Sequence, residues 1–160
     1  MLPPSADAFQ QHRRLADGDQ PLAAAVWKVA PWGVFAIYSE DHGRGWKRGQ
    51  PVPGNDVGQE NRLVELADER LLMDYRRQNG PHRWVTVSSD GGATWSEPRP
   101  GLAVTPVCCA IERYTLKTSG DDRNRVRWTG PRGPGRTKLV IRVSCDDSQK
   151  GRIDTPIRPC

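Results

Sequence analysis

The stretch Ser88-Ser89-Asp90-Gly91-Gly92-Ala93-Thr94-Trp95 decides the fold, because it recurs along the chain. A closely similar stretch, Ser39-Glu40-Asp41-His42-Gly43-Arg44-Gly45-Trp46, lies about 50 residues earlier, with Gly in place of the Thr. A third, decayed copy begins at Ser144-Cys145-Asp146-Asp147, about 55 residues further on, and keeps only the Ser and the Asp. A period of this length indicates a repeat architecture.

The chemistry of the repeated stretch predicts a tight hairpin turn. Its Ser and Asp lie two residues apart before a Gly, so their side-chain oxygens can accept hydrogen bonds from backbone N–H groups. The Gly supplies a positive φ, and we expect the Trp to pack under the turn. We therefore interpret Asp41 and Asp90 as turn-forming rather than catalytic carboxylates. The turn residues of the three copies are Ser39, Asp41, Gly43, Trp46, Ser88, Asp90, Gly92, Thr94, Trp95, Ser144 and Asp146.

Strand-like segments flank these turns, and no stretch has the pattern of a long helix. Apolar and polar residues alternate before each copy, and two further strand-like runs lie between the first two copies. These segments are residues 37–38, 62–66, 70–75, 82–88 and 139–143. We predict an all-β fold in which each repeat forms one antiparallel sheet of a β-propeller.

The length of the chain bounds how much of a propeller it can form. At about 50 residues per repeat, 160 residues give about three blades, whereas closed propellers have roughly four to eight. We expect a poorly structured segment at 1–25, a propeller portion at 26–148 and an unmatched tail at 149–160. Because an open arc leaves strand edges uncovered, we expect a fragment, a truncated reading frame or a chain that needs a partner to close.

The charge distribution favours an anionic partner. The net charge is +5, and the positive excess is concentrated between Arg123 and Arg142, around Trp128. Basic residues interleaved with an aromatic suit an anionic sugar or nucleic acid, but they are also typical of a solvated loop. Nucleic acid is the least favoured of these three interpretations.

The four cysteines, Cys108, Cys109, Cys145 and Cys160, do not have the spacing of a metal site, and we interpret them as ordinary thiols. We expect no metal and no organic cofactor. The first 25 or so residues contain neither a secretory apolar region nor a membrane-spanning segment.

Five stretches, read in order, resemble the bacterial exo-α-sialidases with Asp-box (BNR) repeats, and the resemblance covers roughly residues 32–147. It implies a six-bladed propeller, of which this chain forms about three blades. It also implies the release of terminal sialic acid from glycoconjugates, so the expected partner is a sialylated glycan or another anionic sugar. The stretches are residues 38–43, 59–66, 70–76, 88–98 and 130–139.

The resemblance implies a pocket in which three arginines hold the sugar carboxylate, a Tyr attacks the anomeric carbon, a Glu takes the Tyr proton and an Asp acts as acid and base. These residue types suit the chemistry. The carboxylate on the anomeric carbon would repel a carboxylate nucleophile, whereas a phenol is neutral until a base activates it. The planar fork of arginine pairs with both carboxylate oxygens at once.

Three residues of this chain match the motifs of that family. Glu60 matches the base, Arg76 the second pocket arginine and Arg136 the third. Arg77 and Arg132 are the alternatives within the two arginine stretches.

Other parts of the family's catalytic set have no match in this sequence. Nothing matches the first pocket arginine or the acid/base Asp, and Tyr38, Tyr75 and Tyr114 occupy strand positions rather than that of the nucleophile. We therefore expect an exo-α-sialidase-like glycoside hydrolase that is incomplete and inactive as it stands. The alternative is a non-catalytic Asp-box propeller module that binds anionic glycans or protein.

Overall fold

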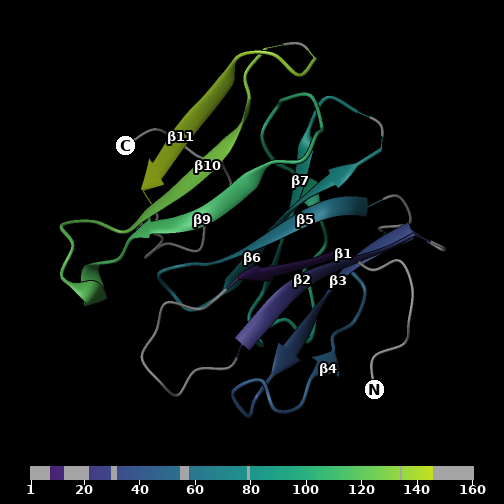
Figure 1. Cartoon of the computed structure of the whole chain (residues 1–160), viewed down its shortest axis with the longest axis vertical. Coiled ribbons are helices and arrows are strands. Elements are labelled where there is room, and N and C mark those ends of the chain that lie inside the picture. The colour runs from purple at the N-terminus through teal and green to yellow at the C-terminus, as the bar shows by residue number, and fades with distance from the viewer. Residues whose placement is uncertain are drawn as a thin grey trace.

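The protein folds into three antiparallel sheets that follow one another along the chain (Figure 1). The computed structural model describes residues 8–12, 22–29, 32–54, 58–78, 80–133 and 135–145. Within these ranges the only helix is one short 3-10 turn, Lys117–Ser119. The prediction of an all-β fold with one sheet per repeat is confirmed.

The first sheet has the strand order β1(Ala8–His12), β2(Leu22–Val29), β3(Trp32–Ser39), β4(Lys47–Arg48). The second has the order β5(Gly58–Glu65), β6(Leu71–Arg77), β7(Arg83–Ser88), β8(Arg99–Pro100). The third consists of β9(Ala110–Thr115), β10(Arg125–Pro131) and β11(Leu139–Cys145), with β10 in the middle. β5 lies between β9 of the third sheet and the first sheet, in which β2 is the strand that contacts it most (Figure 1).

The N-terminal part of the chain differs from the expectation for segment 1–25. β1 lies inside this segment and pairs with β2, which itself begins at Leu22. No periodic apolar pattern marks β1, because its place is set by pairing with β2 rather than by its own sequence. The tail 149–160 lies outside the described residues.

The second Asp box forms the hairpin turn between β7 and β8. The Ser88 hydroxyl donates to Asp90 Oδ1 at 2.7 Å and accepts from the Gly92 N–H at 2.8 Å. Asp90 Oδ1 in turn accepts from the Thr94 N–H at 2.9 Å. Gly92 has a φ of 102°, and Trp95 is 8% exposed. The side chains thus replace the backbone partners that the turn lacks.

The first Asp box repeats this geometry between β3 and β4. The Gly43 N–H donates to Ser39 Oγ at 2.7 Å, and the Gly45 N–H donates to Asp41 Oδ1 at 2.7 Å. Trp46, however, is 39% exposed, so it is not the buried anchor that the sequence predicts. In the third copy Ser144 lies in β11, and Asp146 lies outside the described residues.

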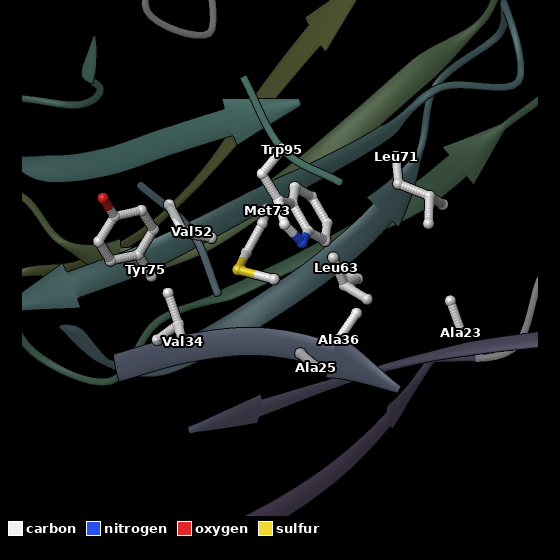
Figure 2. Close-up of a cluster of buried hydrophobic side chains, with 10 residues drawn as sticks. All are labelled: Ala23, Ala25, Val34, Ala36, Val52, Leu63, Leu71, Met73, Tyr75 and Trp95. Atoms are coloured by element: carbon white, nitrogen blue, oxygen red, sulfur yellow. The ribbon is translucent and has the colours of Figure 1, made fainter. Parts of the chain in front are cut away.

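A hydrophobic cluster joins the first sheet to the second (Figure 2). Small side chains from β2 and β3 face larger ones from β5 and β6, and Val52 and Trp95 fill the space beside them. Each fully buried large apolar side chain contributes about 1.5–3 kcal/mol. The members from the four strands are Ala23, Ala25, Val34, Ala36, Leu63, Leu71, Met73 and Tyr75.

A second cluster joins the second sheet to the third. Val64 and Leu72 from the second sheet pack with Ile111, Val126 and Trp128 from the third. Both faces of the second sheet are therefore covered, as expected for a blade inside a propeller. In β7 the polar residues Arg83, Thr86 and Ser88 are buried, whereas the apolar residues are half-buried.

The cysteines do not all have the same state. Cys108 and Cys109 are free, whereas Cys145 is disulfide-bonded, so the interpretation as ordinary thiols is wrong for Cys145. The sequence spacing of cysteines does not reveal which of them approach one another in space. Among the described residues, no helix has the length and apolar character needed to span a membrane.

The Asp boxes predict how stability changes in acid. Hydrogen bonds from the Gly45 N–H and the Ser39 hydroxyl lower the pKa of Asp41. At Asp90 burial raises the pKa, but hydrogen bonds from Thr94 and Ser88 outweigh it and lower the pKa overall. A carboxylate with a lowered pKa stabilises the fold above its unfolded pKa, about 3.9, and this contribution disappears as the pH falls through the folded-state pKa.

We therefore expect the midpoint of urea unfolding to fall steeply below about pH 4, and Asp90→Asn to make this dependence shallower. The midpoint is measured by tryptophan fluorescence across this pH range. Glu97→Gln, which changes an exposed carboxylate in the same loop, should keep the slope of the unmodified chain. An unchanged slope in Asp90→Asn would contradict this account of the turn.

Candidate active site

Glu60 lies in a β-bulge near the start of β5. The register between β5 and β6 shifts between Gln59 and Arg62, so Glu60 and Asn61 leave the regular ladder. Glu60 has a φ of 40°, in the left-handed region that residues other than glycine rarely adopt. A bulge of this kind redirects a side chain relative to its strand.

The redirected carboxylate of Glu60 meets Arg76. Arg76 lies near the end of β6, where it pairs with Gln59 across the ladder. Arg76 Nη1 donates to Glu60 Oε2 at 3.0 Å, and the two side chains are 22% and 28% exposed. Glu60 uses one N–H of the guanidinium, and Nε is buried without a hydrogen-bond partner, so the remaining Nη donors are those that a ligand carboxylate can use. The structure thus brings together two of the three predicted site residues.

The neighbouring arginine, Arg77, points elsewhere. Its guanidinium stacks on the ring of Trp84 at 4.0 Å and donates to the carbonyl of Gly54 at 2.7 Å. Successive side chains of a strand face opposite sides, so only one of two adjacent arginines can meet Glu60. This geometry favours Arg76 over Arg77 as the pocket arginine.

Arg136 lies in the hairpin between β10 and β11, and both it and its alternative, Arg132, are exposed. The hairpin is closed by the Arg132 N–H, which donates to the Lys138 carbonyl at 2.9 Å. Among the described residues, no hydrogen bond or ion pair joins Arg136 to Glu60 or Arg76. The hairpin connects the second strand of its sheet to the third, and the segment after Arg76 makes the same connection in the second sheet.

The three tyrosines have other environments. Tyr75 is fully buried in the cluster of Figure 2, and burial raises its pKa to about 12, opposite to what an activated phenol requires. Tyr38 packs against the same cluster. Tyr114 is 56% exposed and lies against the Arg127 guanidinium.

Sequence reasoning missed a group of buried polar residues beneath Glu60. Asn61, 1% exposed, donates from its side-chain amide to the Val26 carbonyl of the first sheet at 2.9 Å. Arg83 and Asp74, 0% and 2% exposed, form a buried ion pair at 3.0 Å. One sequence signal was present, since Asp74 is a lone acid in the apolar run Leu71–Tyr75, and a buried acid needs a partner.

Several basic residues between Arg123 and Arg142 make contacts within the chain. Arg125 pairs with Asp122, Arg127 pairs with Glu112, and Arg142 lies over the ring of Trp128. These contacts favour the interpretation of the stretch as a structural surface over a nucleic-acid interface. In the part of the chain that the structure describes, no cluster of His, Cys, Asp and Glu has the arrangement of a metal site.

The successive sheets, the Asp-box turns between their third and fourth strands, and the Glu60–Arg76 pair define part of an Asp-box β-propeller. The chain belongs to the family of BNR repeat-like domains, which it matches over residues 10–151.

The most similar relatives include sialidases. The chain is 32% identical to a sialidase of Micromonospora viridifaciens, in a match that covers 79% of this chain and 20% of the relative. It is 30% identical to a sialidase of Clostridium perfringens, in a match that covers 72% of this chain and 32% of the relative. It therefore spans less than a third of the length of these relatives. Among solved structures, the intramolecular trans-sialidase of Ruminococcus gnavus aligns with a TM-score of 0.71 at 22% identity, over 92% of this chain and 31% of that one. The prediction of a partial sialidase-type propeller is confirmed.

Proposed function

We propose that this chain forms part of the sialic-acid pocket of an exo-α-sialidase-like glycoside hydrolase. The observation that carries the proposal is the Glu60–Arg76 pair, in which a base and a carboxylate-binding cation lie 3.0 Å apart and partly exposed. Arg136 is proposed as a second contact to the sugar carboxylate from the β10–β11 hairpin.

The roles follow from the chemistry of the two groups. The guanidinium of Arg76 has donors beyond the one that Glu60 uses, and a planar fork of this kind pairs with a carboxylate. The Glu60 carboxylate is an acceptor, held by Arg76 in one orientation, and it suits removal of a proton from a phenol. None of the three tyrosines of this chain is placed as that phenol, so we expect sugar binding without enzymatic turnover by the isolated chain.

Arg76→Ala should weaken the binding of free sialic acid by at least about tenfold, because it removes a charge-assisted, bidentate partner of the carboxylate. Calorimetric titration of the purified chain measures this effect. Arg77→Ala is the matched control, since Arg77 is the next residue but contacts Trp84 and Gly54, and it should bind as the unmodified chain does. Equal affinities for Arg76→Ala and Arg77→Ala, or no binding by the unmodified chain at millimolar sugar, would reject the proposal.

A second candidate function is a non-catalytic module that binds anionic glycans. The surroundings of the three tyrosines favour it, because Tyr75 is buried with a raised pKa and the other two contact a hydrophobic cluster and Arg127. Hydrolysis of a fluorogenic sialoside tests the non-catalytic module. Turnover that disappears in Glu60→Gln would reject it, whereas binding without turnover is the result expected for both candidates.

A further inference from the structure

The guanidinium of Arg83 is fully buried, and each of its three nitrogens donates a hydrogen bond. Arg83 is the first residue of β7, and its Nε donates to Asp74 Oδ1 at 3.0 Å. Nη1 donates to the Val107 carbonyl at 2.6 Å. Nη2 donates to the carbonyls of Glu60, at 3.1 Å, and of Asp74, at 3.2 Å. One side chain thus holds the backbone at three places that are far apart in the sequence.

The other carboxylate oxygen of Asp74 connects this group to the third sheet. Asp74 Oδ2 accepts a hydrogen bond from the indole N–H of Trp128 at 3.0 Å, and Trp128, on β10, is 1% exposed. Val107 also belongs to the segment that leads into the third sheet. Asp74 and Arg83 therefore link the docking of that sheet to the backbone of β5.

The backbone carbonyl that Arg83 holds is the one of Glu60 itself. In a bulge the ladder does not satisfy every backbone group, and a buried carbonyl without a partner is costly. The left-handed φ of Glu60 is a further strain that the surroundings must stabilise, typically about 1–3 kcal/mol. The hydrogen bond from Arg83 supplies both the partner and the restraint.

We propose that Arg83 is a positioning residue that fixes the Glu60 bulge, and thereby sets the Glu60 carboxylate against Arg76. Trp128 acts on the same bulge through Asp74, so the site takes its geometry only when the third sheet is docked. The effect of Arg83 on sugar binding rests on the proposed function, whereas its effect on the position of the Glu60 carboxylate does not.

Arg83→Lys tests the proposal, because lysine keeps the charge beside Asp74 but lacks the planar fork that reaches several carbonyls. The matched control is Arg113→Lys. Arg113, on β9, donates to the carbonyl of Glu65, which lies at the other end of β5. Both substitutions weaken a contact between the second and third sheets, but only Arg83 contacts the Glu60 carbonyl, so a merely structural role does not predict a change in the Arg76 signals for one variant alone.

The readout is the arginine side-chain NMR spectrum of the full chain without sugar. In the unmodified chain, Glu60 restrains Arg76, and we expect separate Nη signals from a slowly rotating guanidinium. Arg83→Lys should lose this separation, and Arg113→Lys should keep it. Retention in both variants, or loss in both, would overturn a specific role for Arg83.

Trp128→Phe decides the question if Arg83→Lys fails to fold, since it removes the N–H donor to Asp74 and keeps a buried aromatic ring, although a smaller one. We expect it to lose the separation of the Arg76 signals, and an unchanged spectrum would overturn the proposal. Sialic acid titration of the same variants gives a second readout, with affinity at least about tenfold weaker in Arg83→Lys than in Arg113→Lys. Absence of sugar binding by the unmodified chain would reject the proposed function alone, because the NMR comparison needs no sugar.

Discussion

Asp74→Asn should lower the free energy of unfolding by about 3–5 kcal/mol, which is a large part of the stability of a domain of this size. The substitution hardly changes the volume of the side chain, so it creates no cavity. It removes the negative charge that faces the Arg83 guanidinium, which is 0% exposed and cannot reach water. In the unmodified chain both carboxylate oxygens accept a hydrogen bond, from Arg83 Nε and from Trp128 Nε1. The amide of asparagine has one acceptor oxygen, so one of these two donors loses its partner.

The effect is measured by urea unfolding followed by tryptophan fluorescence. Asp68→Asn is the matched control, because Asp68 also pairs with an arginine, Arg70, at 2.7 Å, but with side chains 34% and 28% exposed. Partly exposed pairs of this kind contribute about 0–1 kcal/mol. A loss of stability in Asp74→Asn no larger than that in Asp68→Asn would show that the buried pair does not stabilise the fold.

The parts of the fold that the sequence predicts are those with local causes. The Asp-box turn depends on hydrogen bonds between residues two to four apart, such as those that join Ser88 to Asp90 and Gly92, so the motif alone specifies it. The strands beside the turns follow from alternation. β1 was missed because it has no such pattern, and it exists through its pairing with β2.

The buried polar residues of β7 show where alternation fails. The sequence of this strand alternates as if one face were solvated, yet Arg83, Thr86 and Ser88 are 0%, 1% and 2% exposed. Thr86 and Ser88 bond to Ser96 and Asp90 in the loop that follows β7, and Arg83 bonds to Asp74, so each of these residues has a hydrogen-bond partner in place of water. These partners lie outside the strand, so its own alternation does not show that its polar residues are buried.

The resemblance to the sialidases predicted two residues of the candidate site, but not the bulge that orients one of them. Glu60 and Arg76 lie 16 residues apart, and the antiparallel pairing of β5 with β6 brings them to one end of the sheet. The bulge that directs Glu60 toward Arg76 has no sequence signal that we can identify. The bulge is supported by Arg83, Asp74 and Trp128. Asp74 and Trp128 are 54 residues apart in the sequence, so no local pattern predicts their contact.

Gly49→Ala should destabilise the protein by about 3 kcal/mol, at the upper end of what overpacking costs, because the added methyl group has no space. A Cβ at Gly49 would lie 2.1 Å from the carbonyl oxygen of Gly92, in the Asp box of the next sheet. The clash involves backbone on both sides. Next to it, the Gly49 N–H donates to the Ala36 carbonyl at 2.8 Å, and the Gln50 N–H donates to the Ala93 carbonyl at 2.8 Å.

Relief of this clash requires the first sheet to move away from the second. The peptide groups on both sides of the one that carries the Gly92 carbonyl are held, because Ser88 Oγ accepts from the Gly92 N–H and the Ala93 carbonyl accepts from the Gln50 N–H. Gly133→Ala is the control, since its Cβ would lie 2.7 Å from the hydroxyl of Thr137, the end of an exposed side chain that can rotate. Urea unfolding should therefore separate the two variants by at least about 2 kcal/mol. If they unfold at the same midpoint, the contact between one blade and the Asp box of the next is soft, and the packing of blades depends on the hydrophobic cluster alone.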